Sequence, residues 1–566
     1  MQSAIEIISA AVERALGAPA LLRPCADSQF GDYQANGVMA VAKQTKQNPR
    51  ALAENIAAQL QLADVCEPPT VAGAGFINFK LRREFVAAQV TDAARDPRHG
   101  VPAASKPKTV VIDFSSPNVA KPMHVGHIRS TILGDCLGRV LRFLGHHVVT
   151  DNHIGDWGTQ FGMLIVGWKK HRDDAALQRD AITELERLYK YVNEHGDREE
   201  AKSELVKLQQ GNTENRAIWQ QIIDLSKHEF DRIYGRLGVA FDHTLGESFY
   251  NPMLAAVVGG LRAHGIATES DGAMCIFVEG SKSPLIIQKA DGAFLYGTTD
   301  LATLKYRLDE WRPDEIVYVT DGRQQLHFKQ VFAAAAKWLP NVPDLRHVWF
   351  GSILGEDGTP LKTRSGENVK LGELLDEAEE RARAVVNEKN PEMPEQIRNT
   401  IARAVGIGAV KYADLSQNRT TDYVFSWPKM LAMNGNTAPY MQYAYVRVQS
   451  IFRKAVGQAS NLPNPKTDKL EACPTILLDH PTELDLAKHI LRFTETLQSV
   501  AEDDKPNWLT AYLYDLAGKF SAFYDNCPVI QSAEPTRSSR LLLCRLTADI
   551  MKRGLNLLGI ETIEQM

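Results

Sequence analysis

The sequence predicts a multidomain α/β protein with a doubly wound parallel sheet in the centre, a smaller α/β domain before it and a helical bundle after it. The chain has 566 residues, which is too long for one hydrophobic core, so we expect about three domains. Strand and helix patterns alternate through the central part, as they do in a parallel sheet covered by helices. Helical periodicity then dominates to the end. We place the domains at residues 1–100, 105–370 and 371–566, with an insertion at about 165–285 inside the second.

The composition is that of an ordinary soluble protein, with 44% hydrophobic and 23% charged residues. Seven cysteines are scattered without a CxxC pair, so neither a zinc ribbon nor a disulfide framework is indicated. The N-terminus lacks a basic segment and no apolar run could span a bilayer, so we expect a cytoplasmic protein with no membrane partner. The net charge of −5 does not indicate nucleic acid, and an RNA partner would need local basic patches.

The central domain opens with a strand, a polar loop and a long helix. Residues 110–114 read as a buried parallel strand, and apolar residues at 128–144 recur every four positions, which predicts an amphipathic helix. Between them stand His124, Gly126 and His127, at a helix N-terminus that attracts phosphate. Gly126 lets a base or ribose approach the backbone. His124 and His127 would point the same way and stabilise charge on a phosphate under attack. The plainer interpretation is two surface histidines near a turn.

The longer stretch from Asp113 to Ile132 resembles the signature of class I arginyl-tRNA synthetases, including a form of their HIGH motif and its upstream loop. Other stretches resemble the same family in the same order, over almost the whole chain. The resemblance implies a class I Rossmann-like catalytic domain, an N-terminal appended domain and a C-terminal anticodon-binding bundle. It implies arginine–tRNA ligation with L-arginine, ATP with Mg²⁺ and tRNA(Arg) as substrates, no tightly bound cofactor, no protein-bound metal, and a monomer.

Residues 1–100 look like a compact α/β module without nucleophile or metal spacing, so a structural domain is the plain interpretation. Residues 30–36 precede a predicted second helix, and residues 72–79 read as a glycine turn into a strand. Both segments resemble the family's appended domain, which binds the D-loop corner of tRNA, and exposed aromatic rings can stack on bases. The side chains implied to lie near RNA are Phe30, Asp32, Tyr33, Asn36, Phe76 and Asn78. Residues 96–108, with three prolines, look like a linker.

Residues 147–152 predict the second strand of the sheet, and a loop at 153–162 follows at its carboxyl end, where ligands bind in such folds. The loop resembles the family's active-site wall, which implies that Asp156, Trp157 and Gln160 shape the pocket; an ordinary loop is the alternative. Residues beyond 165 are charge-dense and helical, and we interpret them as an insertion too small for a separate editing domain.

Tyr296 and Asp300 are four residues apart and could share a helical face. A carboxylate is the natural partner of a guanidinium group. The residues alone favour another interpretation, in which Thr298, Thr299 and Asp300 cap the following helix. The resemblance reverses this preference, because the family's Tyr and Asp here hold the substrate's guanidinium. The positions implied to bind arginine are Asp113, Ser115, Asn118, His127, Tyr296, Asp300 and Gln324.

Residues 315–320 predict another buried strand, and residues 347–353 one more. A basic, glycine-flanked loop follows at 355–366, where class I enzymes carry the KMSKS lysines. The match is degenerate, because the second lysine's position is Thr363. A lysine before the HIGH motif is thought to compensate in this family, so the main charge could come from any of three residues, and a bland surface loop is the alternative. The implied catalytic residues are His124, His127, Lys121, Lys362 and Arg364, and the implied ATP contacts are His124, Gly126, His127, His327 and Lys362.

The segment 433–448 resembles the start of the family's anticodon-binding bundle. Its tyrosines and Arg447 alternate in a way that suits base stacking, with Tyr440 and Arg447 as the implied RNA contacts, although such a stripe is more often core. Two rival functions remain at this point. Thr363 in the degenerate loop would suit an inactive tRNA-binding paralogue, and a class I synthetase of another amino-acid specificity is the second rival.

Overall fold

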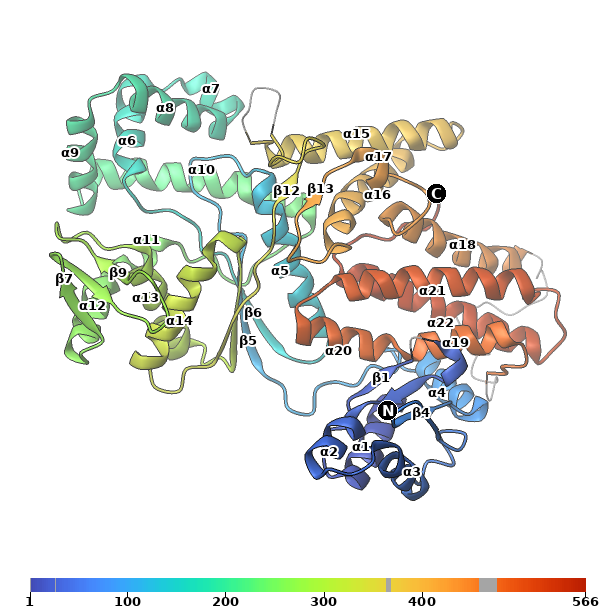
Figure 1. The fold of residues 1–566 in the computed structure, drawn as a ribbon. Coiled ribbons are helices and arrows are strands. Elements are labelled where there is room, and N and C mark those ends of the chain that lie inside the picture. Colours follow the sequence, from blue (N-terminus) through green and yellow to red (C-terminus); the bar gives the residue numbers. More distant parts are fainter. Residues whose placement is uncertain (1, 26, 363–367, 458–475) are drawn as a thin grey trace.

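The structure is a computed structural model, and it describes residues 2–25, 27–362, 368–457 and 476–566. The N-terminal domain is an antiparallel four-stranded sheet in the order β1–β2–β4–β3, with its helices alongside (blue in Figure 1). Its elements are α1 (Ala4–Leu16), β1 (Leu22–Pro24), β2 (Tyr33–Ala35), α2 (Gly37–Thr45), α3 (Pro49–Gln59), β3 (Thr70–Ala72), β4 (Phe76–Phe79) and α4 (Arg83–Arg95). The expected second helix and glycine turn are both present.

The central sheet contains four parallel strands in the order β11–β10–β5–β6. These strands are β5 (Thr109–Phe114), β6 (His147–Asp151), β10 (Glu315–Val319) and β11 (Asp344–His347). β5 is first in the chain but central in the sheet, so the winding reverses beside its carboxyl end. Such a switch point opens a crevice for ligands. The predicted doubly wound fold is therefore confirmed, and it places the loop after β5 at the crevice.

Helix α5 (Val125–Phe143) follows that loop and crosses the middle of the molecule (Figure 1). It packs against the sheet on one side and the helical bundle on the other. The expected stop is close, because Gly145 has a left-handed φ of 96° two residues after the helix ends. Two more helices flank the sheet, α13 (Tyr296–Glu310) and α14 (Gln325–Trp338).

The insertion between β6 and β10 consists of helices and one small antiparallel sheet in the order β7–β8–β9. It forms the green and teal part of Figure 1. Its elements are α6 (Gln160–His171), α7 (Asp174–Arg179), α8 (Ala181–His195), α9 (Arg198–Gln209), α10 (Thr213–Leu237), α11 (Glu247–Tyr250), α12 (Leu254–Ala263), β7 (Ala267–Ser270), β8 (Ala273–Ile276) and β9 (Leu285–Gln288).

The prediction of one strand over residues 347–353 is wrong. β11 ends at His347, and the chain leaves the main sheet before β12 (Ile353–Leu354), which pairs in parallel with β13 (Tyr423–Val424). Gly351 marks the exit, because a Cβ there would lie 2.6 Å from an Asp422 carboxylate oxygen. The apolar pattern continues across a break that the tertiary structure imposes.

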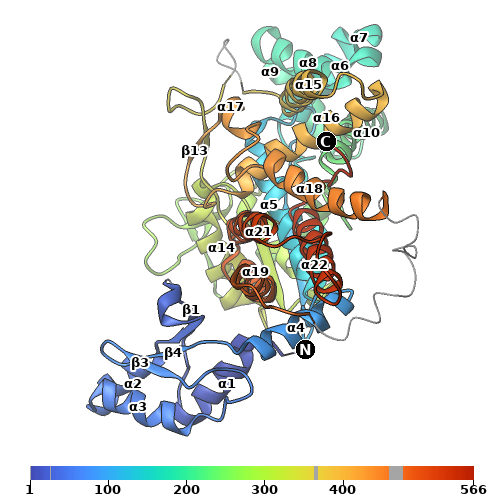
Figure 2. The same cartoon turned by 90° about the vertical axis from the view of Figure 1, so that its right-hand side faces the viewer.

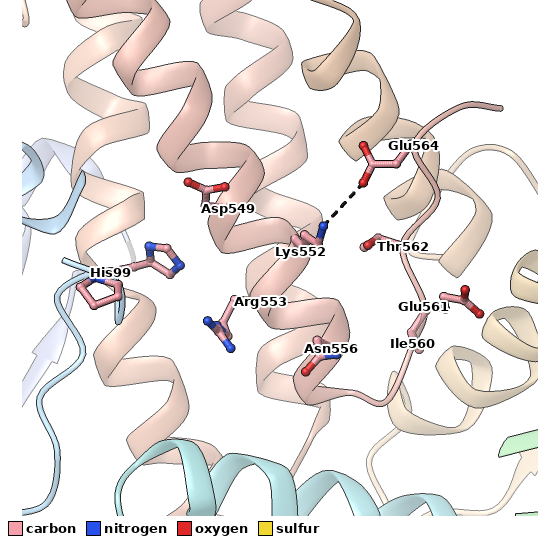
Figure 3. A pocket seen from close by; sticks show the side chains of 10 residues that line it. His99, Asp549, Lys552, Arg553, Asn556, Ile560, Glu561, Thr562 and Glu564 are labelled. Atoms are coloured by element: carbon pink, nitrogen blue, oxygen red, sulfur yellow. Dashed lines mark ion pairs between the residues drawn. The ribbon is translucent and has the colours of Figure 1, made fainter. Parts of the chain in front are cut away.

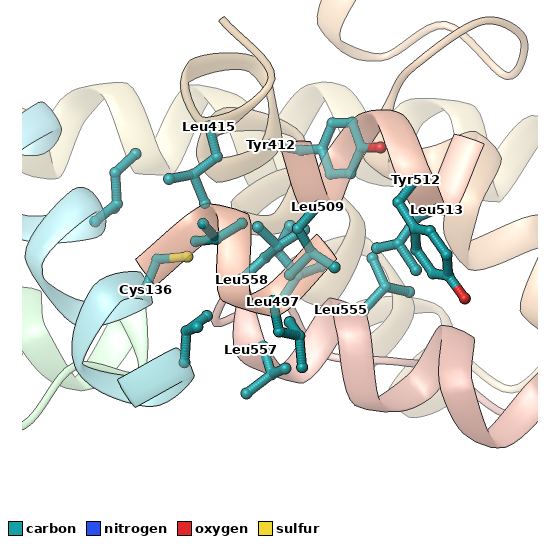
Figure 4. Close-up of a cluster of buried hydrophobic side chains, with 14 of the residues drawn as sticks. Cys136, Tyr412, Leu415, Leu497, Leu509, Tyr512, Leu513, Leu555, Leu557 and Leu558 are labelled. Carbon is teal, nitrogen blue, oxygen red and sulfur yellow. The ribbon is translucent and has the colours of Figure 1, made fainter. Parts of the chain in front are cut away.

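The C-terminal part is helical, as predicted, and the helices run side by side (Figure 2). They are α15 (Leu371–Lys389), α16 (Glu395–Leu415), α17 (Trp427–Met430), α18 (Ala438–Gly457), α19 (Pro481–Leu491), α20 (Phe493–Asp503), α21 (Asn507–Asn526) and α22 (Thr536–Leu557). Cys136 of α5 lies against Leu415, Leu497 and Leu558 in one continuous core (Figure 4). Among the described residues, no helix has both the length and the apolar character needed to cross a bilayer.

Candidate active site

The first turn of α5 presents two imidazole rings side by side, with centroids 4.0 Å apart. His124 is the N-cap residue, and its Nδ1 accepts a hydrogen bond from the Gly126 backbone N–H at 3.0 Å. His127 Nδ1 accepts from the backbone N–H of His124 at 3.1 Å. The helix start therefore fixes both rings, and their Nε2–H groups remain to donate to a ligand.

Both imidazoles are neutral at physiological pH. Burial and the neighbouring His124 lower the pKa of His127 to about 3. Burial, Lys121 and Arg323 lower the pKa of His124. A neutral imidazole with Nδ1 already bonded is a fixed Nε2–H donor, so the pair can stabilise developing negative charge without first taking up a proton.

An acidic hollow lies at the start of α13. Asp300 is in the second turn of this helix, and Tyr296 begins the helix with 72% of its surface exposed. The N-cap is Leu295, which makes no side-chain cap bond. The alternative in which Thr298, Thr299 and Asp300 cap the helix is therefore wrong, and the Asp300 carboxylate is not used for capping.

Glu247 adds a second carboxylate to the hollow, and no motif in the sequence points to this residue. Burial, Asp156 and Asp300 raise the pKa of Glu247 to about 8. The pKa of Tyr296 is also raised. The charge of Glu247 has the largest effect, followed by burial and then by the charge of Asp300. These shifts require the three groups to be close. A carboxyl group whose pKa is raised by nearby carboxylates marks a place where a cation would bind.

The segment after β10 has side chains near both the acidic hollow and the histidine pair. His327 Nε2 lies 2.5 Å from Asp300 Oδ2. Although burial opposes it, the hydrogen bond and the charge of Asp300 raise the pKa of His327. Arg323, one turn earlier, is close enough to His124 to lower its pKa. Gln324, which lies between them in the sequence, is exposed, so residues 321–328 join the histidine pair to the acidic hollow beside the cleft that a switch point opens.

Two residues expected to contact arginine have partners inside the protein. Asp113 is 5% exposed, and its Oδ2 accepts a hydrogen bond from Arg307 at 2.6 Å. The Ser115 hydroxyl is buried and bonded to the hydroxyls of Thr131 and Tyr234, both at 2.8 Å. The expectation that these side chains face the substrate therefore does not fit the structure. Both instead hold the end of β5 in place.

Asn118 is exposed at the mouth of the cleft, where its backbone pairs with Gly155 in the loop after β6. A Cβ on Gly155 would lie 2.2 Å from the Asn118 side-chain oxygen, so only glycine allows this approach. Asp156 is buried and accepts hydrogen bonds from the Ser248 backbone and hydroxyl at 2.8 and 2.6 Å. This loop therefore forms a wall of the cleft and positions the segment that carries Glu247.

Of the candidate cations, Lys121 lies near the histidine pair, because it lowers the pKa of His124. Lys121 is exposed, with its ammonium 5.6 Å from the centre of the Tyr189 ring. Lys362 is also exposed, and its backbone bridges to Asn368. Residues 369–371 are held against the first turn of α5, because Val125 N–H donates to the Val369 oxygen and Leu371 N–H to the Met123 oxygen on either side of the bridge between His124 and Lys370. Arg364 and Thr363 lie outside the described residues.

The N-terminal residues expected to meet RNA fall into two groups. Phe30 is 46% exposed, and Phe76 and Asn36 are partly exposed. Tyr33 is 3% exposed and donates its hydroxyl proton to Glu495 at 2.5 Å. Asn78 is 2% exposed and accepts from the Gln34 amide. The expectation of RNA contact does not fit these two, because the bundle and the sheet cover them.

Asp32 is also engaged within the protein, by Lys488 of α19 at 2.8 Å. In the bundle, Tyr440 is partly exposed, with its ring 5.9 Å from that of Tyr514. Arg447 lies 3.5 Å from Asp525 and over the Tyr524 ring. Tyr440 is therefore only partly accessible, and Arg447 has partners within the bundle.

A separate cavity of about 640 Å³ lies between the linker, α22 and the C-terminal tail (Figure 3). Its lining mixes cations such as Arg553 with acids such as Asp549 and Glu564, and Lys552 faces Glu564 across it. None of the residues expected to bind arginine or ATP lines this cavity. The cleft beside α5 therefore remains the candidate active site.

A doubly wound sheet with a paired-imidazole helix start at its switch point, followed by a helical bundle, defines a class I aminoacyl-tRNA synthetase. Family comparisons match residues 89–427 to "tRNA synthetases class I (R), catalytic domain", residues 441–566 to "DALR anticodon binding domain" and residues 2–81 to "Arginyl tRNA synthetase N terminal domain". The chain belongs to the arginyl-tRNA synthetase family.

Similar proteins agree over the full length. The arginine–tRNA ligase of Synechococcus elongatus is 49% identical, with 96% of this chain and 95% of that one covered. The arginine–tRNA ligase of Salmonella typhimurium is 48% identical, with 98% and 97% covered. The crystal structure of arginyl-tRNA synthetase from Plasmodium falciparum has a TM-score of 0.85 and 31% identity, with 99% and 98% covered. That from Thermus thermophilus has a TM-score of 0.83 at 24% identity, with 99% of each covered, and shows the shared fold.

Proposed function

We propose that the chain joins L-arginine to the 3′ end of tRNA(Arg) at the expense of ATP, and that the cleft beside α5 carries out the activation step. The observation that carries the proposal is the pairing of a fixed imidazole donor pair with an acidic hollow along one segment, residues 321–328. The first suits a phosphate under attack and the second suits a planar cation. A rival specificity for an uncharged or anionic amino acid has no use for two adjacent carboxylates.

The acidic hollow binds the substrate guanidinium. Asp300 and Glu247 are the anionic partners, Tyr296 closes the exposed side, and Gln324 and Asn118 meet the amino acid's main-chain groups. An arriving guanidinium lowers the pKa of Glu247, because an opposite charge favours the ionised form. Binding therefore converts a protonated acid into a carboxylate that forms a charge-assisted hydrogen bond. A neutral side chain of the same length would leave Glu247 protonated and gain far less.

Activation is an in-line displacement at the α-phosphate of ATP, supplied with Mg²⁺ as the substrate complex. A carboxylate oxygen of arginine forms a bond to phosphorus as the bond to pyrophosphate breaks. His124 and His127 donate their Nε2–H groups to the oxygens that gain charge, and Gly126 allows the nucleotide to approach. Both reactants already carry their reactive groups, so positioning and electrostatics supply the catalysis.

Lys121 and Lys362 supply positive charge toward the leaving pyrophosphate. Lys121 is the better supported of the two, because it already lowers the pKa of His124 and so lies near the donor pair. Arg364, which lies outside the described residues, remains a third proposed source.

The tRNA is held at both ends of the molecule, by Phe30, Asn36 and Phe76 in the N-terminal domain and by Tyr440 and Arg447 in the bundle. We propose functional units at residues 1–100, 105–370 and 371–566, with the insertion at about 165–285. We also propose that the enzyme acts as a monomer in the cytoplasm, where tRNA is charged for protein synthesis.

The test is arginine-dependent exchange of pyrophosphate into ATP, run with every amino acid and with and without tRNA. Asp300→Asn should lower kcat/KM for arginine by roughly 30- to 150-fold, the loss expected for a charge-assisted hydrogen bond of about 2–3 kcal/mol. Asp309→Asn is the matched control, because Asp309 is on the same helix but pairs with Lys305 at the surface. Exchange with another amino acid would overturn the specificity, and no exchange with any would favour the inactive paralogue.

A further inference from the structure

Arg129 is a buried cation two residues past His127 on α5. Its side chain is 1% exposed, and so is that of Asp414 near the end of α16. The Arg129 Nε lies 3.1 Å from the Asp414 Oδ2. Its Nη1 donates to the backbone oxygens of Gly351 at 2.7 Å and Thr421 at 3.2 Å. One guanidinium therefore ties the helix that carries the histidine pair to three other segments.

Two aromatic rings enclose this cation. The Arg129 Cζ lies 5.7 Å from the centre of the Phe350 ring and 5.2 Å from that of Tyr423. Burial raises the pKa of Asp414, and the charge of Arg129 and the hydrogen bond from the Tyr423 hydroxyl act against this rise. Because the planar group has several acceptors in fixed directions, a lysine could not satisfy them together.

The segments held by Arg129 lead directly into the ATP side of the cleft. Gly351 and Thr421 stand two residues before β12 and β13 begin, and the chain that leaves β12 leads to Lys362 eight residues later. The chain that returns to α15 is held in turn by α5, because the Val125 N–H donates to the Val369 oxygen at 2.9 Å and the Leu371 N–H to the Met123 oxygen at 2.8 Å. The flank that follows residues 363–367 is therefore fixed to the start of α5, and the Lys362 backbone is linked to that flank through its bridge to Asn368.

The rest of α5 offers no freedom to compensate. Its apolar face is buried in the core, where Cys136 lies against Leu415 of α16, Leu497 of α20 and Leu558 at the end of α22 (Figure 4). The helix and bundle thus behave as one packed body, with Arg129 as the polar link at the catalytic end. Packed interiors transmit a displacement rather than absorb it.

We propose that Arg129, through Asp414 and the Gly351 carbonyl, is a positioning residue for the activation step: it sets where the segment carrying Lys362 stands relative to His124 and His127. It touches neither substrate. The inference rests on the proposed function, since it assigns a task within that reaction. A misplacement of about 1 Å in such a constellation costs roughly 100-fold in rate.

The test separates positioning from stability. Arg129→Met alone leaves Asp414 buried and unpaired, so the variant is expected to lose melting temperature. Arg129→Met combined with Asp414→Leu replaces the ion pair by apolar groups of similar volume, and such replacements often restore stability. The matched control is Arg139→Met, because Arg139 is also on α5, pairs with Asp135 at 2.8 Å and donates to the Gly238 oxygen, but contacts no segment that leads to Lys362.

We expect the double variant to recover the wild-type melting temperature while kcat for pyrophosphate exchange stays at least about 10-fold down. KM for arginine should remain within about 2-fold, because the acidic hollow is held by other contacts, and KM for ATP should rise. Arg129→Lys should recover stability but not kcat.

Three results would overturn the proposal: wild-type kcat in the double variant, an equal kcat loss in Arg139→Met, or a rise in KM for arginine equal to that for ATP. Arginine-dependent exchange by the unaltered enzyme is measured in the same series. Its absence would refute the proposed function, whereas its presence with active Arg129 variants would refute this inference alone.

Discussion

The affinity for arginine should rise with pH, and Glu247 should be the cause. The pKa of Glu247 is about 8 in the unliganded chain, whereas a guanidinium demands the ionised form. Only about 9% of the molecules carry an ionised Glu247 at pH 7, and about 91% at pH 9, if one group titrates alone. The apparent Kd for arginine scales inversely with this fraction, so it should fall about 10-fold between these pH values, or about 1.4 kcal/mol.

The assay is calorimetric titration of arginine into the full-length chain at intervals from pH 6.5 to 9. Glu247→Gln is the essential comparison, because the amino group of arginine also titrates in this range and its effect is common to both proteins. The variant should bind more weakly at pH 9 and lose the 10-fold trend. Citrulline, which is neutral at the same position, should show no trend due to Glu247. A parallel pH dependence in both proteins would refute the reasoning.

The remaining predictions concern the donor pair and the tRNA surface. His127→Ala should lower the activation rate by roughly 100- to 1,000-fold, the loss typical of a removed oxyanion donor, with arginine Kd by dialysis unchanged; unaltered exchange kinetics would remove its role. Lys121→Ala should raise the pKa of His124 toward its usual range, because one of the cations that lowers it is gone, and imidazole NMR titration checks this; an unmoved pKa would place the lysine elsewhere. Tyr33→Phe should lower the melting temperature, measured by calorimetry, without weakening tRNA binding in a filter assay. Phe30→Ala should weaken tRNA binding without lowering the melting temperature. Weaker tRNA binding by Tyr33→Phe at an unchanged melting temperature would show that Tyr33 contacts RNA.

The elements of the fold could be predicted because their signals are local. The strand at 110–114 and the helix after His127 follow from apolar periodicity, and the order of strands and helices then indicates a doubly wound sheet. The failure at 347–353 has the opposite cause. Those residues are apolar enough for one strand, but Gly351 fits against Asp422 and Thr421, which are remote in sequence.

The site was predictable only where residues are close in the chain. The spacing of His124 and His127 shows in the sequence, and so does that of Tyr296 and Asp300. The role of Glu247 does not show in the sequence, because this residue lies in a short helix with no motif. It comes close to Asp300 only after the insertion folds back. A pattern of carboxylates converging on one point is visible only in three dimensions.

The same limit applied to side chains whose roles depend on burial. Tyr33 reads as an exposed aromatic until α20 brings Glu495 to its hydroxyl. Asp113 reads as a free carboxylate until α13 brings Arg307 to it. At both positions the residue type is visible in the sequence, but its partner comes from a distant element. That partner decides whether the side chain can contact a ligand.

Arg307 also reduces the excess negative charge that four neighbouring carboxyl groups would otherwise bring to the cleft. It is fully buried, and its Nη2 donates to Asp113 at 2.6 Å and to Asp151 at 2.7 Å. Without it, these two carboxylates would lie behind Asp300 and Glu247, and a protein can keep so many like charges only by protonating them. The internal guanidinium takes up the deeper pair of acids. Asp300 and Glu247 are then left facing the opening, where the substrate's cation meets them.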